Sequence, residues 1–159
     1  MGDELSHVDA SGAARMVDVA GKPVTARSAT ARGRVEVSPR VVELLRSEGV
    51  PKGDALAVAR IAGIMAAKRT HELIPLCHQL NLTKVAVNLE PSETPVGVRV
   101  TAEAKLTGQT GVEMEALTSV TVAALTVIDM VKAVDKHARI TDVEVVAKSG
   151  GRSGDWSRE

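Results

Sequence analysis

The stretch from residue 112 to residue 135, VEMEALTSVTVAALTVIDMVKAVD, constrains the fold more than any other part of the chain. At about 100° per residue, its polar side chains fall on one narrow stripe of a helix. The stripe contains Glu115, Ser119, Thr126 and Asp129, with Lys132 on its flank, and most of the remaining surface is Val, Leu, Ile, Met and Ala. A helix that is apolar on nearly every side has to be covered by other elements. We therefore expect a mostly buried helix with a single polar seam.

Two more helices are predicted before this stretch. Ser38 followed by Pro39 is a typical helix start, because serine caps the first N–H groups and proline suits the first helical position. This helix ends near Gly49, and a second, alanine-rich helix covers residues 54–72. Small residues spaced by four along the second helix allow a close approach to a neighbouring sheet or helix, and these are Ala59, Gly63 and Ala67.

Alternation of apolar and polar residues predicts the strands. The first covers residues 25–38, a hairpin around a proline-containing turn covers 82–90 and 96–106, and the last strand covers 139–148. The core order βαββαβ is that of a ferredoxin-like α+β sandwich with an antiparallel sheet. In this prediction the core is preceded by an extra N-terminal strand and helix.

Length and composition limit the function classes. The 159 residues, 44% of them hydrophobic, predict one domain over residues 1–159, with flexible ends at 1–14 and 149–159. Phe and Tyr are absent and Trp156 is the only aromatic residue, so bases of single-stranded nucleic acid would find no stacking platform. Twenty basic residues balance twenty acidic ones, which favours neither a nucleic-acid nor a membrane partner.

Targeting signals and cysteine usage point to the cytoplasm. The N-terminus has no apolar leader segment, and no apolar run approaches the roughly 18 residues that would span a bilayer. The single cysteine, Cys77, excludes an internal disulfide, which fits a reducing compartment. We expect a cytoplasmic protein without membrane contact.

The long helix carries the strongest candidates for chemistry. Asp129 and Lys132, at i and i+3, can pair, which either neutralises a half-buried carboxylate or forms an acid/base couple. Glu113 and Glu115 begin the helix, where carboxylates are favoured by the helix dipole in any case. That structural explanation is strong for Glu113 and weaker for Glu115.

Other candidates are individually weak. Turn and helix-end lysines are usually solvated, the glycine-rich segment after Lys148 resembles a mobile tail, and one cysteine beside one histidine is weak support for a metal site. Together the half-buried lysines, carboxylates and histidine around an apolar pocket favour a phosphorylated small molecule as ligand. The residues in question are Lys52, Lys68, Arg69, Cys77, His78, Lys148 and Arg152.

Five motifs in order along nearly the whole chain add a resemblance. They are MVDV (16–19), KGD (52–54), ARIAGIMAAKRTHELIPLCHQL (59–80), LTGQTGVEMEALTSVTVAALTVIDMVKAV (106–134) and AKSGGRSGDW (147–156). The chain closely resembles the molybdenum cofactor biosynthesis protein C family, the cyclic pyranopterin monophosphate synthases. Two departures are visible: Gln79 replaces the usual proline, which affects loop rigidity, and Arg152 replaces a lysine with its charge kept.

The resemblance implies a lyase of molybdenum cofactor biosynthesis. Such an enzyme converts 3',8-cyclo-7,8-dihydro-GTP, made by a radical SAM GTP cyclase, into cyclic pyranopterin monophosphate and releases pyrophosphate. The rearrangement needs several proton transfers and no redox cofactor. No metal site is expected, and whether a divalent ion accompanies the triphosphate is left open.

The resemblance also assigns roles by motif. Asp129 matches the general acid/base, and Lys52 and Lys132 match catalytic lysines. The substrate-contacting positions are Leu76, Cys77, His78, Glu113, Met114 and Glu115, and the expected triphosphate contacts are Arg27, Lys68 and Lys148. On this interpretation the IPLCHQL segment forms a pocket wall, with His78 on the substrate and Cys77 as packing or a backbone contact.

Helix geometry predicts a site shared between subunits. Glu115 and Asp129 are fourteen residues apart, which is roughly 21 Å along the helix axis, too far for one nucleotide-sized ligand. Two antiparallel helices about a two-fold axis would bring opposite ends together, with the ridge around Gly63 as a further packing surface. The resemblance points to a homohexamer of three dimers. The alternative is that only one end of the helix is functional.

Two rival functions stay open at this point. A ferredoxin-like fold also suits a non-catalytic oligomeric module that binds a small molecule and returns it unchanged. A metal-dependent hydrolase is disfavoured, because the sequence has no His/Asp/Glu cluster at ligand spacing.

Overall fold

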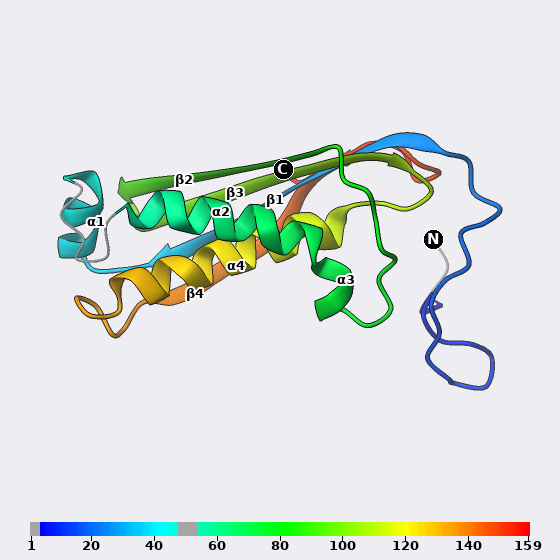
Figure 1. Cartoon of the computed structure of the whole chain (residues 1–159), viewed down its shortest axis with the longest axis horizontal. Coiled ribbons are helices and arrows are strands. Elements are labelled where there is room, and N and C mark those ends of the chain that lie inside the picture. Colours follow the sequence, from blue (N-terminus) through cyan, green and yellow to red (C-terminus); the bar gives the residue numbers. More distant parts are fainter. Residues whose placement is uncertain (1–3, 48–53) are drawn as a thin grey trace.

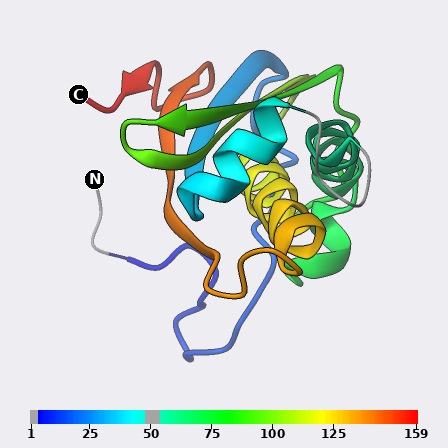
Figure 2. The same ribbon diagram turned by 90° about the vertical axis from the view of Figure 1, so that its left-hand side faces the viewer.

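The computed structural model describes residues 4–47 and 54–159. The elements follow in the order β1 (Thr25–Glu36), α1 (Pro39–Arg46), α2 (Ala55–Lys68), α3 (Thr70–Leu73), β2 (Lys84–Glu93), β3 (Val96–Gly108), α4 (Glu113–Val131), β4 (Arg139–Ser149) and β5 (Trp156–Ser157). The sheet forms one layer, and α2 and α4 lie side by side on one of its faces (Figures 1 and 2).

The five-stranded sheet has the order β2-β3-β1-β4-β5, and every pairing is antiparallel. With α2 and α4 as the connecting helices, this is the ferredoxin-like α+β arrangement, which confirms the predicted fold class. The strand counted as extra is β1, the central first strand of the βαββαβ unit itself. The additions are α1, inserted between β1 and α2, and β5, which pairs with the end of β4 and carries Trp156.

Helix α4 forms the centre of the core, as its apolar surface predicts. Its side chains Val120 and Val127 are fully buried, together with Val35 and Val100 of the sheet. By length and composition α4 is apolar enough to cross a membrane, with a mean hydropathy of 1.6. This corrects the expectation from the sequence, which considered only uninterrupted apolar runs. Since 56% of that window is buried inside the protein, α4 is a core helix.

The small residues of α2 pack inside the subunit. A Cβ atom on Gly63 would lie 3.0 Å from the Ser119 carbonyl oxygen and 3.1 Å from the Ala123 Cβ of α4. Ala59 and Ala67 are also buried. The ridge therefore sets the close approach of α2 and α4, and the expectation that it serves as a packing surface between subunits is wrong.

The predicted second helix is interrupted near its end. The hydroxyl of Thr70 donates to the carbonyl oxygens of Ala67, at 3.0 Å, and Ala66, at 3.4 Å. Side chains that bond to backbone groups compete with the helix ladder. Consequently α2 ends at Lys68, and the short helix α3 turns the chain toward the segment at residues 74–80.

Candidate active site

A cavity of about 580 Å³ lies at the N-terminal end of α4. Its size suits a single small-molecule ligand. Three segments that are distant in the sequence line most of it: the N-terminal segment, the loop before β2, and the start of α4. The lining side chains include Val17, Val19, Lys22, Leu76, Cys77, His78, Glu113, Met114 and Glu115. The structure thus brings together all six residues predicted to contact substrate.

Glu115 is the most unusual residue of this cavity. It is only 4% exposed, and it shares the cavity with the loop at residues 76–80. Burial raises the pKa of the Glu115 carboxyl from 4.5 to about 7, the N–H group of its own backbone lowers it, and the charge of Glu113 raises it further. A carboxyl that titrates near neutrality both donates and accepts protons.

Sequence reasoning gave Glu115 a role in substrate contact only. The signal for an acid/base role lay in its neighbours, because a glutamate flanked by Val112, Ala116 and Ser119 on a buried helix has few ways to stay solvated. The N-terminal segment was not predicted to line the cavity at all, since its sequence has no periodic pattern.

Cys77 and His78 are neighbours in the loop before β2, but their side chains differ in chemistry. Burial raises the pKa of the Cys77 thiol, and the negative charge of Glu115 raises it further, so the thiol stays protonated and is a poor nucleophile. The His78 ring uses Nε2 to donate to the carbonyl oxygen of Val17 at 2.7 Å, which ties the loop to the N-terminal segment. Its Nδ1 then acts as an acceptor in the neutral ring.

A basic hollow of about 440 Å³ adjoins the cavity, because Lys22 lines both. Arg27 and Arg152 contribute guanidinium groups, and Arg27 Nε donates to the Gly108 carbonyl oxygen at 3.1 Å, which fixes the side chain. Concentrated positive charge with planar donors suits phosphate oxygens. The cavity lined by the predicted substrate contacts and a candidate anion site are thus neighbours.

Lys148, predicted to contact the triphosphate, lines neither this hollow nor the cavity. Lys148 Nζ lies 3.1 Å from Glu113 Oε1, with both side chains about 30% exposed, so β4 is tied to the start of α4. Gly151 has a φ of +78°, and a Cβ atom there would overlap the Arg27 guanidinium. Only glycine lets the chain pass so close to Arg27.

The remaining predicted residues lie elsewhere. Asp129 and Lys132 pair at 2.6 Å in the last turn of α4, at the end of the helix remote from the cavity. The expected half-burial of Asp129 is wrong, since its side chain is 56% exposed: the loop at residues 76–80 covers the polar stripe only near Glu115. Lys68 is exposed and lines neither hollow, and Lys52 lies outside the described residues.

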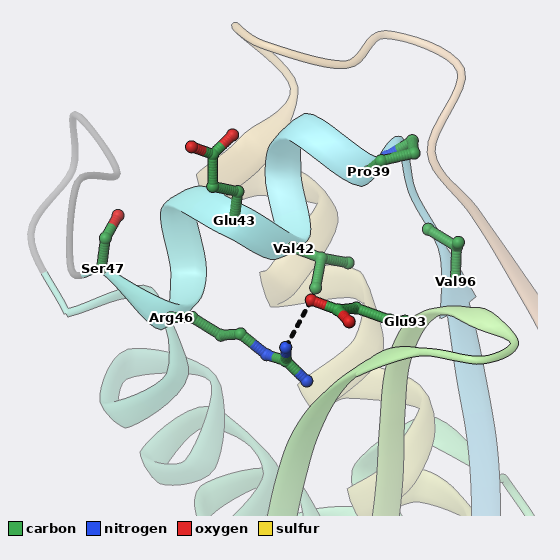
Figure 3. Close-up of a pocket in the computed structure, with 7 residues that line it drawn as sticks. All are labelled: Pro39, Val42, Glu43, Arg46, Ser47, Glu93 and Val96. Carbon is green, nitrogen blue, oxygen red and sulfur yellow. Dashed lines mark hydrogen bonds and ion pairs between the residues drawn. The ribbon is translucent and has the colours of Figure 1, made fainter.

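Another hollow, of about 460 Å³, lies between α1 and the β2–β3 hairpin (Figure 3). Arg46 and Glu93 form an exposed ion pair at 2.6 Å beside it, and much of the remaining lining is apolar. Among the predicted site residues that the structure describes, none lines this hollow. It contributes nothing to the candidate site.

Fold and site together define a ferredoxin-like α+β protein with a buried acid/base group next to a basic anion site. Comparison of the sequence with known protein families assigns the chain to one family. The model of the MoaC family matches residues 16–151. The chain therefore belongs to the MoaC family.

Curated relatives resemble the chain over nearly its whole length. A cyclic pyranopterin monophosphate synthase of Streptomyces avermitilis is 69% identical over 98% of this chain and 91% of its own. A protein of the same name from Nocardioides is 68% identical over 97% of this chain and 95% of its own. Another protein of this name, from Brucella ovis, is 55% identical over 99% of this chain and 95% of its own.

Proposed function

We propose that this protein is a cyclic pyranopterin monophosphate synthase, a lyase of molybdenum cofactor biosynthesis that acts on cyclised dihydro-GTP and releases pyrophosphate. The observation that carries the proposal is the position of Glu115, a carboxyl with a pKa of about 7, in a cavity that shares Lys22 with a basic hollow. A nucleotide substrate needs both parts. Relatives that are 55–69% identical bear this enzyme name.

The basic hollow and the cavity have different roles in this proposal. Arg27 and Arg152 of the basic hollow offer positive charge to the phosphate groups, and Lys148, a further predicted contact, is paired with Glu113. Glu115 and His78 offer proton-exchanging groups to the base and sugar, and Leu76 and Met114 supply apolar contact. Cys77 forms part of the wall. No step of the rearrangement needs a redox cofactor, and a divalent ion on the phosphates is compatible with this arrangement.

The exposed pair Asp129–Lys132 acts in the site of a second subunit, and Lys52 keeps the catalytic role that its motif predicts. Asp129 exchanges protons, and the lysines stabilise negative charge or relay protons. One helix cannot present both of its ends to one ligand, because fourteen residues span roughly 21 Å. Exposed apolar side chains on α2 and α4 provide a surface for a second copy, and these are Val58, Ile61, Met65 and Leu125. This surface supports pairing with a second copy, and the family resemblance extends the proposal to a hexamer of three dimers.

A refolding experiment tests the shared site. The variants His78→Ala and Lys132→Ala are each inactive on this proposal, and they are unfolded together and refolded as a mixture. If each site draws one group from each of two chains, about one quarter of the sites are intact. If both groups come from one chain, no activity returns and the shared site is refuted. Refolded single variants serve as controls for the refolding step.

Conversion of substrate tests the function itself. The protein is incubated with cyclised dihydro-GTP from a radical SAM GTP cyclase, the partner that supplies the substrate in this proposal. Released pyrophosphate and the fluorescent oxidation product of the pterin are measured. A non-catalytic binding module would return the ligand unchanged, and that result would refute the proposal. The cytoplasmic location expected from the sequence stays a prediction.

A further inference from the structure

The N-terminal arm, residues 4–24, is a structured element that closes one side of the cavity. Within it, Val8 and Ala14 form an isolated β-bridge around a turn. Asp9 organises this turn, because its Oδ1 accepts hydrogen bonds from the Ser11 hydroxyl at 2.6 Å and from the backbone N–H groups of Ser11 and Ala13. The same bonds lower the pKa of the Asp9 carboxyl, with the Ser11 hydroxyl as the largest cause.

Hydrogen bonds from two sides hold the arm across the cavity. His78 donates to Val17 from the loop before β2, and Gln109 Nε2 donates to the carbonyl oxygens of Ala20, at 3.3 Å, and Lys22, at 3.0 Å. His78 also lines the cavity, and Gln109 lies in the turn between β3 and α4. The arm is thereby anchored to both walls that carry predicted substrate contacts.

His7 lies in this arm and lines the cavity. Its Nδ1 lies 3.3 Å from the Arg15 carbonyl oxygen, and Arg15 N donates to the His7 carbonyl oxygen at 2.9 Å. Since a carbonyl oxygen only accepts, Nδ1 carries the proton. In this tautomer Nε2 carries no proton and can accept a hydrogen bond from a ligand.

We propose that His7 is a further substrate-contacting residue, which presents its Nε2 to a ligand in the cavity that Glu115 also lines. The inference rests on the proposed function for the identity of the substrate. His7 precedes the segment that the family model matches, residues 16–151. With His78, it gives the cavity two imidazoles, each oriented by a backbone carbonyl of the same arm.

Two conservative variants separate substrate contact from support of the arm. In His7→Asn, the side-chain amide reproduces the Nδ1–H donor to Arg15 but does not reach as far as Nε2. In His7→Gln, the amide reaches the Nε2 position but gives up the Nδ1 bond. We expect about a tenfold higher KM for His7→Asn and His7→Ala, the effect of one lost hydrogen bond from a ligand N–H or O–H group, and near wild-type KM for His7→Gln.

His71→Ala is the matched control, because His71 lies on α3 and does not line the cavity, so its KM should be unchanged. A defective His7→Gln with a normal His7→Asn would show that His7 only supports the arm, and the inference would fail. Unchanged KM in all three His7 variants would also overturn it.

A second measurement does not depend on turnover. The chain has four histidines, so the ring signals of a histidine-labelled sample are assigned with single variants and followed while GTP is added as a stable probe. We expect the signals of His7 and His78 to move together and saturably, with His71 unmoved. If His78 moves and His7 does not, the inference is wrong. If both move while cyclised dihydro-GTP is not converted, the proposed function fails and His7 remains a ligand contact.

Discussion

Replacing Glu115 with glutamine should stabilise the fold increasingly as the pH rises. Burial keeps the pKa of Glu115 at about 7 in the folded protein, against 4.5 for an unperturbed side chain. The folded state thus holds the proton more tightly than the unfolded state, so the free energy of unfolding falls as the pH rises from 4.5 to about 7. Above that range the full cost of the buried charge is present.

The size of this effect follows from the pKa shift. A rise from 4.5 to about 7 corresponds to about 3 kcal/mol, and most of it is lost between about pH 5 and about pH 8. The variant Glu115→Gln has no charge to bury. Relative to wild type, it should therefore gain about 2 to 3 kcal/mol of stability at about pH 8 compared with about pH 5.

Urea unfolding followed by far-ultraviolet circular dichroism measures this difference. Both proteins are unfolded at both pH values and at one protein concentration, since assembly makes stability depend on concentration. Thr118→Val is the matched control: Thr118 is also buried in α4 and carries no titrating group, so its effect should be the same at both pH values. A pH-independent effect of Glu115→Gln would refute the reasoning, because it would show that Glu115 titrates normally.

Three further outcomes are expected. Asp129→Asn and Lys132→Ala should each lower kcat by about 100-fold or more but change the free energy of unfolding by no more than about 0.5 kcal/mol, because the pair is exposed; unfolding of either variant at ambient temperature would show a structural role. Cys77→Ser should keep most of the activity, since burial and Glu115 hold the thiol protonated, and a folded but inactive variant would contradict this. KM should rise with added salt, because the basic hollow around Arg27 is open to screening, and a salt-independent KM would argue against a phosphate site there.

Much of the fold was predictable because local signals agree with the final packing. The cap at Ser38 is present, its hydroxyl accepts from Val41 N, and the apolar surface of the long helix led directly to its place at the centre of the core. The break at Arg69 was missed, since the Thr70 hydroxyl acts through bonds to Ala66 and Ala67 that no periodicity reveals. The ridge around Gly63 predicted close packing but not which partner it packs against.

The residues that line the cavity were largely predictable, but the exposure of each predicted side chain was not. Motifs brought His78 and Glu115 to attention, and the structure puts both on one cavity. Glu115 and Asp129 lie on the same polar stripe of the helix. However, Glu115 is 4% exposed, whereas the side chain of Asp129 is 56% exposed. That contrast arises from the loop and the N-terminal arm covering one end of α4, a tertiary effect that a helical projection does not contain.

The lone aromatic residue determines what optical spectroscopy can observe in this protein. Trp156 is 43% exposed on β5, with the Arg158 guanidinium 5.5 Å from the ring centre, and it pairs in register with Lys148. The core built around α4 contains no fluorophore, since Phe and Tyr are absent. Intrinsic fluorescence therefore has no probe inside the core and reports directly on the docking of the last strand. Because that strand adjoins Lys148, the same emission is a built-in reporter of events at the basic side of the site.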